Sequence, residues 1–216
     1  KKYNNEKIFN FIHKKIKKSQ LNDFRLRILN QINKDENCRY SYFKVTKPYL
    51  EAIVGNELVM QKKINLSIQL PEDQDSLLAV HSDVWSGDSP FEVVVWLPLV
   101  NCFRTKSMYI LPANLINQFN KKISKKNYQN SEKVFQLIKK KIKWIKINYG
   151  QVLIFNQSLP HGNRVNKESE TRWSLNCRFK NIFSPYGDKK IGEFFEPITL
   201  RAASEMGLKY KLPKMK

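Results

Sequence analysis

Apolar residues recur at two different spacings along the chain, and the change between them divides it into two parts. Up to about residue 60 they fall every three or four positions, as on one face of a helix, in the stretches 8–16 and 21–32. A third helix is predicted to begin at Pro48, a residue suited to the first turn of a helix, and to run through Val54. Residues 1–60 are therefore expected to form a helical front end.

From about residue 63 the apolar residues alternate with polar ones, the period of a strand with one buried face. The segments with this pattern are INLSIQL, LLAVHSD, FEVVVWLPLV, SMYILP, WIKIN, GQVLIFN and TRWSLNCRFKNI. One helical insert interrupts them at 113–142, centred on SEKVFQLIKKKI and including a short helix at ANLINQF. Short strands without regular strand–helix alternation favour an antiparallel barrel or jelly roll over a parallel sheet.

These patterns predict one domain that is mainly β with helical additions. The helical front end would be followed by a barrel core at 61–182, which contains the insert, and by a C-terminal extension at 183–216. The extension is expected to pack back on the core, with a short helix near its end.

The chain of 216 residues carries a formal net charge of +20. Its lysines are concentrated in helical, solvated stretches such as KKISKK and LIKKKIK, and no nucleic-acid-binding motif accompanies them, so nucleic acid is not the expected partner. A positive field favours a small anionic substrate instead. The sequence has no apolar run of membrane-spanning length and no signal-peptide centre, and its three cysteines share no CxxC spacing. We therefore expect a cytoplasmic protein with reduced thiols and no membrane partner.

The stretch HSD, at residues 81–83, follows an apolar run and contains one of three histidines. Positions i and i+2 of a strand point to the same side, so His81 and Asp83 would project together. His13 lies on a lysine-rich helix, whereas His161 follows the strand GQVLIFNQSLP and is the better third ligand. Two histidines and a carboxylate are typical of non-haem Fe(II) oxygenases, and zinc is the rival metal.

The strand TRWSLNCRF places Arg172, Ser174, Asn176 and Arg178 on alternate positions, and so on one face. A buried arginine needs an anionic partner because an unpaired guanidinium is costly to desolvate. A dicarboxylate cosubstrate would provide such a partner.

The chain resembles the HxD...H...RxS pattern of Fe(II)- and 2-oxoglutarate-dependent oxygenases. The matching residues are HSD at 81–83, the distal His161, and Arg172, which lies eleven residues beyond His161 and is followed by Ser174. Among these enzymes the chain most resembles the phytanoyl-CoA dioxygenase-like branch. Its VVVWLPLV strand also resembles that branch. HSDVWSGDSPFEVVVWLPLVNC with TKSMYILP further resembles oxygenases of bacterial carbohydrate and aminoglycoside biosynthesis clusters. The resemblance covers roughly residues 65–182 and implies a double-stranded β-helix, the cupin-like jelly-roll barrel.

By this resemblance, His81, Asp83 and His161 would hold Fe(II), and 2-oxoglutarate would chelate the iron and leave a position for O2. Arg172 would pair with the distal carboxylate of the cosubstrate, and Ser174 would donate its hydroxyl to it. Related halogenases lack the carboxylate, so Asp83 favours hydroxylation, with desaturation and ring formation left open. The implied substrate is a small polar or anionic metabolite such as a sugar, sugar nucleotide or aminoglycoside precursor.

Two further side chains are candidates for the same pocket. Gln69 shares strand parity with Ser67 and would either touch the cosubstrate or face solvent. Arg178 would either bind substrate or pair with an acid of the tail such as Glu193.

Three residues have competing roles. Trp96 is expected in the core more than in a ligand contact, and Asn163 is expected to fix the turn after His161. Lys106 is a rival anchor for the distal carboxylate, although Arg172 fits the pattern better.

Two other classes of function remain alternatives to the oxygenase. The first is a metal-binding barrel of the lyase type. The second is a basic nucleic-acid or interaction module in which the histidine and aspartate are structural.

Overall fold

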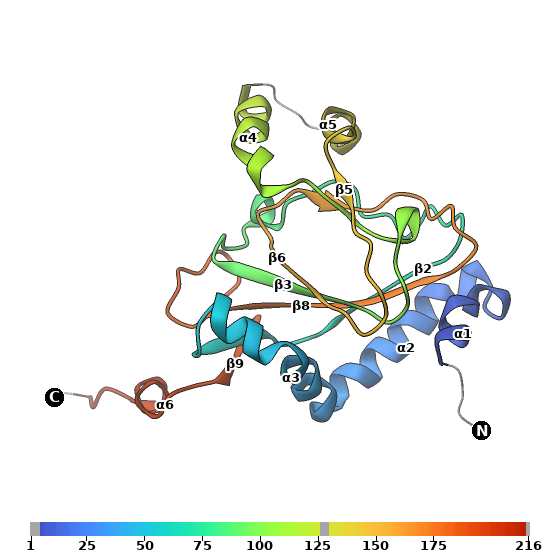
Figure 1. Cartoon of the computed structure of the whole chain (residues 1–216). Coiled ribbons are helices and arrows are strands. Elements are labelled where there is room, and N and C mark those ends of the chain that lie inside the picture. Colours follow the sequence, from blue (N-terminus) through green and yellow to red (C-terminus); the bar gives the residue numbers. More distant parts are fainter. Residues whose placement is uncertain (1–4, 126–129, 215–216) are drawn as a thin grey trace.

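Two antiparallel sheets form the centre of the computed structural model, which describes residues 5–125 and 130–214 (Figure 1). The larger sheet has six strands: β1 (Leu58–Gln61), β2 (Asn65–Gln69), β3 (Glu92–Pro98), β6 (Leu153–Asn156), β8 (Arg172–Asn181) and β9 (Phe195–Thr199). The smaller sheet has the order β5 (Lys143–Trp144), β4 (Tyr109–Ile110) and β7 (His161–Gly162). Strand β8 is central because it pairs with β3 along one edge and with β2 and β1 along the other.

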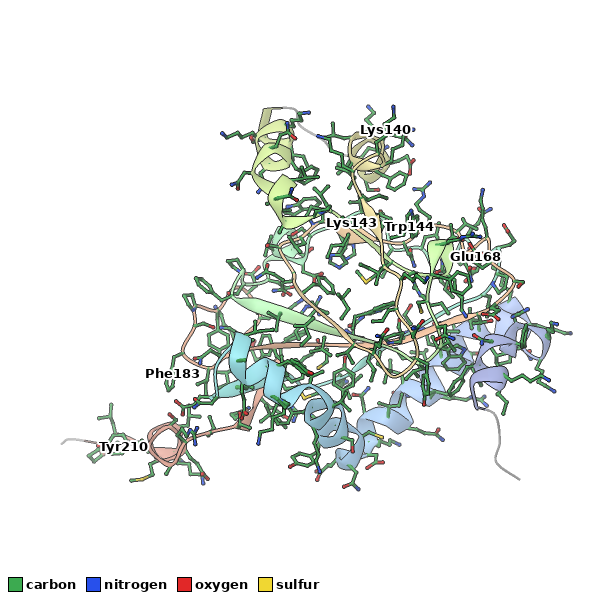
Figure 2. The ribbon with its side chains drawn as sticks, in the orientation of Figure 1. Lys140, Lys143, Trp144, Glu168, Phe183 and Tyr210 are labelled. Atoms are coloured by element: carbon green, nitrogen blue, oxygen red, sulfur yellow. The ribbon has the colours of Figure 1, made fainter. Side chains whose placement is uncertain are left out.

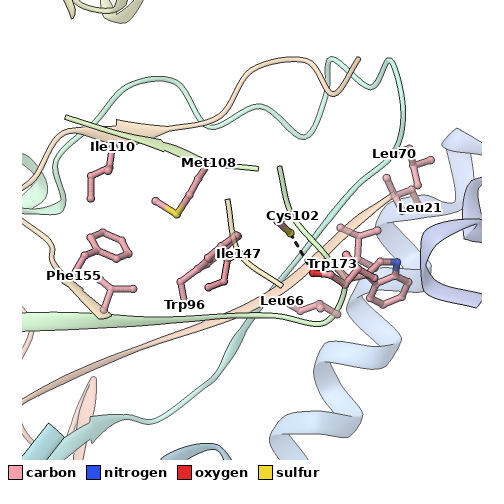
Figure 3. Packing of buried hydrophobic residues seen from close by; sticks show 13 residues of the cluster. Leu21, Leu66, Leu70, Trp96, Cys102, Met108, Ile110, Ile147, Phe155 and Trp173 are labelled. Atoms are coloured by element: carbon pink, nitrogen blue, oxygen red, sulfur yellow. Dashed lines mark hydrogen bonds between the residues drawn. The ribbon is translucent and has the colours of Figure 1, made fainter. Parts of the chain in front are cut away.

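The main hydrophobic core lies between the two sheets. Trp96 and Phe155 of the larger sheet share this cluster with Met108 and Ile110 of the smaller one (Figure 3). The cluster also reaches the opposite face of the larger sheet through Leu66, Ile68 and Trp173. Nearly all of its members come from segments predicted by the two-residue period, in which successive side chains lie on alternate faces of a sheet.

Helices cover the outer face of the larger sheet. They are α1 (Asn5–Asn10), α2 (Leu21–Lys34) and α3 (Glu36–Ile53), with short 3₁₀ turns η1 (Ile12–Lys14) and η2 (Lys18–Gln20) between α1 and α2. Trp173 of β8 is 2% exposed and donates its indole N–H to the carbonyl of Phe9, 3.0 Å away. The aromatic and hydrogen-bonding contacts of this one side chain fasten α1 to the sheet.

The helix start predicted at Pro48 is wrong, because α3 begins at Glu36 and contains Pro48. The Asp35 carboxylate caps the helix by accepting from the Asn37 N–H at 2.9 Å. Phe43 and Leu50 are buried against the sheet on either side of the proline. Burial of this apolar face stabilises the helix through a position that lacks one backbone N–H.

The insert forms helices, as its periodicity predicts. They are η5 (Ala113–Leu115), α4 (Ile116–Lys125) and α5 (Ser131–Ile138), which lie beyond the smaller sheet (Figure 1). Their apolar faces pack on Tyr109 and Leu111, while Lys140 points away from the body beyond α5 (Figure 2). The lysines of this part for which the structure gives an exposure, such as Lys121, Lys122 and Lys140, are exposed.

Other strand predictions need correction. LLAVHSD forms a single bridge at His81 instead of a strand, because the Leu78 N–H is bonded by the Asn163 side chain at 2.6 Å. Three strands were not predicted. Strand β1 lies in the expected helical front end, β9 of the tail pairs with it, and β7 contains His161, which was expected to follow a strand. Helix α6 (Ala202–Lys209) is the short helix expected near the end, but it has no buried residue.

The strands also do not close into a barrel among the described residues, since the pairing leaves two separate sheets. Isolated bridges such as His81–His161 provide further pairing outside the named strands. The observed architecture is a mainly antiparallel structure with helices on its outer faces. In the part of the chain that the structure describes, no helix has both the length and the apolarity to cross a bilayer.

Candidate metal centre

Three side chains from two separate parts of the chain converge at one end of the inter-sheet space. His81, Asp83 and His161 each offer a ligand atom, and these atoms lie within 4.8 Å of one another. The backbones of the two histidines pair directly, with N–H to carbonyl distances of 3.0 and 2.8 Å. Because this pairing fixes both backbones, it brings the two imidazoles together, with ring centroids 4.3 Å apart and ring planes tilted by 52°.

Both imidazoles are oriented by the same kind of backbone contact. His81 Nδ1 lies 2.8 Å from the carbonyl of Ala79, and His161 Nδ1 lies 2.8 Å from the carbonyl of Leu159. A carbonyl can only accept, so each Nδ1 carries the proton. The Nε2 atoms are left with free lone pairs, which is the arrangement of metal-binding histidines.

Burial also favours the ligand form of His161. Desolvation, together with the nearby His81, lowers the pKa of His161 from 6.5 to about 4. The imidazole is therefore neutral at physiological pH, as a metal ligand must be.

Asp83 is placed by the turn that follows His81. Ser82 is extended, and its hydroxyl donates to the Ser158 carbonyl at 2.9 Å, so it points away from the site. Asp83 then begins the 3₁₀ turn η3 (Asp83–Ser86), and its Oδ1 lies 3.6 Å from His81 Nε2. The turn ends at Gly87, whose φ of 86° lies in the left-handed region that favours glycine.

Gly162 is a requirement of the site that the sequence reasoning missed. A Cβ at this position would lie 2.8 Å from the carbonyl oxygen of Leu78. Only glycine lets the strand after His161 approach the segment before His81 this closely. The HG pair at 161–162 was the available signal.

A cleft of about 730 Å³ leads from the three ligands along the inner face of β8. Arg172 lines it and is 3% exposed, with its Nη2 donating to the Ser67 hydroxyl at 3.0 Å. Burial lowers the pKa of Arg172 to about 10, so the guanidinium stays charged at neutral pH. It has no ion-pair partner among the described residues, and its Nε has no hydrogen-bond partner there.

The neighbours of Arg172 are also left without partners. The Ser174 hydroxyl lines the cleft, is buried, and has no hydrogen-bond partner among the residues described. The Gln69 amide donates to the Arg164 carbonyl at 2.8 Å, while its buried oxygen has no such partner either. Unpaired buried polar groups are rare in native proteins and indicate a missing ligand or water.

The rival anchor Lys106 is already neutralised. Its ammonium lies 2.6 Å from a Glu170 carboxylate oxygen and 2.7 Å from the Asn10 side-chain oxygen, and the residue is fully buried. Lys106 therefore links α1 to the loop before β8, which leaves Arg172 as the better anion anchor.

The remaining candidates are distributed as follows. Asn163 accepts from the Leu78 N–H and donates to the Ser76 carbonyl, so it joins the segment after His161 to the segment before His81. Trp96 belongs to the core cluster and also lines the cleft.

Arg178 lines the cleft and pairs with Asp83 at 3.1 Å, and with Asp88 at 3.7 Å. This contact with a candidate ligand side chain was not predicted.

The comparisons with known proteins concern the fold. No protein-family model matches the sequence, and no curated protein matches it. The solved structure titled "Non-heme monooxygenase, ThoJ-Ni complex" is similar with a TM-score of 0.51 and 15% identity, over 71% of this chain. The apo form of ThoJ gives a TM-score of 0.51 and 14% identity, also over 71% of this chain.

A third structure, "non-heme alpha ketoglutarate dependent carbocyclase SnoK from nogalamycin biosynthesis", has a TM-score of 0.49 and 13% identity, over 73% of this chain and 70% of its own. The chain spans just over half of the two ThoJ chains, 56% and 57%. At these identities the ThoJ likeness shows that the two proteins share a fold.

Proposed function

We propose that this protein is an Fe(II)- and 2-oxoglutarate-dependent oxygenase. One observation carries the proposal: His81, Asp83 and His161 bring their ligand atoms within 4.8 Å of one another, with each imidazole Nδ1 on a backbone carbonyl, beside a cleft that holds an unpaired buried guanidinium. A buried guanidinium without a counterion does not stabilise a folded chain by itself, since its desolvation is not offset by a charged partner.

The donor set fits a divalent transition metal. Two imidazole nitrogens and one carboxylate oxygen are the ligands of the non-haem iron triad, and they leave other coordination positions free. Zinc accepts the same ligand types, so the assignment of iron depends on the cleft residues that could bind 2-oxoglutarate. A ferrous ion bound there would supply dioxygen activation coupled to oxidative decarboxylation of 2-oxoglutarate.

The other residues of the cleft fit the cosubstrate. Arg172 offers a planar charged fork to a carboxylate, and Ser174 offers a hydroxyl that has no partner in the described chain. Gln69 lies directly opposite Arg172 in the β2–β8 register and carries a free buried oxygen. We assign the distal carboxylate of 2-oxoglutarate to Arg172 and Ser174, with Gln69 fixing the wall beside them.

The fold supports this assignment. The two facing sheets are consistent with a double-stranded β-helix, the jelly-roll barrel, in which the triad lies at one end of the inter-sheet space. ThoJ, a non-haem monooxygenase by its title and solved with nickel, has a similar fold. The jelly-roll assignment and the phytanoyl-CoA dioxygenase-like branch are part of the proposal.

The substrate would be a small polar or anionic metabolite. Side chains near the mouth of the cleft include Asn22, Arg25 and Asn65, which suit hydroxyl and carboxylate or phosphate groups. A sugar, sugar nucleotide or aminoglycoside precursor has these groups, and hydroxylation is the proposed outcome because Asp83 is retained as a ligand. Arg178 also lines the cleft, so its contact with substrate stays a prediction.

Succinate release tests the proposal. Purified protein is supplied with Fe(II), ascorbate and 2-oxoglutarate in air, and succinate is quantified against Asp83→Ala, which is expected to release none. Metal binding without 2-oxoglutarate binding in calorimetry would instead favour a lyase-type metal site. Nucleic-acid binding that persists at about 150 mM salt, together with absent metal binding, would favour the basic interaction module.

A further inference from the structure

The guanidinium of Arg178 contacts the carboxylate of Asp83, one of the three proposed metal ligands. Arg178 Nη2 lies 3.1 Å from Asp83 Oδ1, and this side chain is only 15% exposed. Its Nε donates to Gln157 Oε1 at 3.0 Å and lies 3.7 Å from Asp88 Oδ2, while Nη1 donates to Gln61 Oε1 at 3.4 Å. Residues from three segments of the chain therefore hold the guanidinium in place.

The groups that hold Arg178 are themselves fixed and buried. Asp88 is 1% exposed at its side chain and accepts from Lys189 Nζ at 2.8 Å. Gln157 is fully buried and donates through Nε2 to Glu92 Oε2 and to the Ser89 carbonyl, both at 2.7 Å. A long side chain held at this many points has few alternative rotamers, so its position is well defined.

Gln157 also ties the two ligand segments together. Its carbonyl accepts from the Asp83 N–H at 3.1 Å, and His161 follows four residues later. The same residue thus contacts the backbone of the carboxylate ligand and the side chain that pairs with it.

We propose that Arg178 is a positioning residue that holds the Asp83 carboxylate in the orientation that faces His81 and His161. This inference rests on the proposed metal site. An aspartate has two freely rotating torsions, and the 3.1 Å contact selects the conformation in which Oδ1 lies 3.6 Å from His81 Nε2. Contacts to a ligand from outside the coordination sphere orient it and are typically worth about 10- to 100-fold in metal affinity.

Charge alone predicts the opposite effect of removing this residue. A guanidinium next to a cation site repels the cation, so a purely neutralising Arg178 would weaken metal binding. Its replacement by methionine would then strengthen binding. The sign of the change therefore separates orientation from neutralisation.

Calorimetric titration of tag-free protein with Ni²⁺ alone tests the inference. Arg178→Met is expected to weaken Ni²⁺ binding about 10- to 100-fold, with Arg178→Lys between it and the wild type, because an ammonium restores one contact without the fork. Unchanged or tighter binding by Arg178→Met overturns the proposal. The matched control is Arg164→Met, which removes a surface arginine paired with Glu132 at 2.6 Å and should leave Ni²⁺ affinity unchanged.

Two further measurements make each outcome decisive. If near-ultraviolet circular dichroism shows that Arg178→Met does not fold, Arg178→Lys and Asp88→Asn replace it: weaker Ni²⁺ binding by both supports the proposal, and wild-type affinity in either overturns it. If wild-type protein does not bind Ni²⁺, the proposed metal function fails along with this inference. If the wild type binds and releases succinate while the Arg178 variants keep its affinity, only this inference fails.

Discussion

Arg172→Met separates the two roles that a buried arginine can have, stabilising the fold and binding an anion. The guanidinium is 3% exposed and makes two hydrogen bonds, to the Ser67 hydroxyl at 3.0 Å and to the Ser107 carbonyl at 3.4 Å. No carboxylate of the described chain pairs with it. Methionine has a similar length and is apolar, so it can fill the same space without a charge.

The expected loss of cosubstrate affinity follows from the contacts that an arginine makes with a carboxylate. Each hydrogen bond to a charged group contributes roughly 1.5–3 kcal/mol, so a two-point contact corresponds to about 3–6 kcal/mol. At about 1.4 kcal/mol for each factor of ten, Arg172→Met should weaken 2-oxoglutarate binding about 100- to 10,000-fold.

The expected effect on stability has the opposite direction. Replacing a buried charge that lacks a partner by an apolar side chain is often neutral or stabilising, whereas breaking a formed pair is strongly destabilising. The metal-free Arg172→Met protein should therefore unfold at the wild-type midpoint or above it. Lys106→Met should unfold earlier, because it leaves the Glu170 carboxylate without its ammonium at 2.6 Å.

Calorimetry with Ni²⁺-loaded protein gives the affinity for 2-oxoglutarate, and urea unfolding of the metal-free protein gives the stability. Lys106→Met is the matched control, since it removes the other buried cation considered as an anchor and should leave the affinity of the folded protein unchanged. The reasoning is refuted if Arg172→Met binds 2-oxoglutarate within a few-fold of the wild type. It is also refuted if this variant loses several kcal/mol of stability.

Three other predictions concern buried groups. Because the pKa of His161 falls from 6.5 to about 4 on folding, the metal-free protein should lose stability as pH drops from about 6.5 toward 4, and H161Q should lose less over the same range in urea titrations. Cys38 should react with a thiol reagent in the native protein. Cys102 and Cys177 should react only after unfolding, because burial raises their pKa values to about 11 and about 12. Three reactive thiols in the native protein would contradict this prediction. Trp173→Ala should lower the free energy of unfolding by about 3–5 kcal/mol, and a loss below about 1 kcal/mol would show that this contact between α1 and the sheet is dispensable.

The sequence by itself determined the local features of the protein. The two-residue period located β2, β3 and β8 and showed which of their side chains share a face, because alternation is a property of the extended backbone. The same rule placed Arg172 and Ser174 together on β8. The i, i+2 spacing selected His81 and Asp83 as candidate ligands, and His161 was selected because it follows a strand, whereas His13 lies on a lysine-rich helix.

Tertiary structure decided everything that depends on which segments meet. The segment LLAVHSD was expected to form a strand, yet only His81 of it forms a β-bridge, and the Leu78 N–H donates to the Asn163 side chain instead of to a neighbouring strand. Strand β1 was not predicted because it follows directly on a helical region. It forms because its two edges pair with β8 and β9.

The charged residues illustrate the same division. Lys106, Arg172 and Arg178 are equally basic in the sequence, but folding gives the first a carboxylate of its own and the third the ligand Asp83. Arg172 alone of these three is left without an acidic partner. Periodicity fixes the direction of a side chain, whereas its electrostatic partner is set by contacts between residues far apart in the chain, and only the packed structure specifies those.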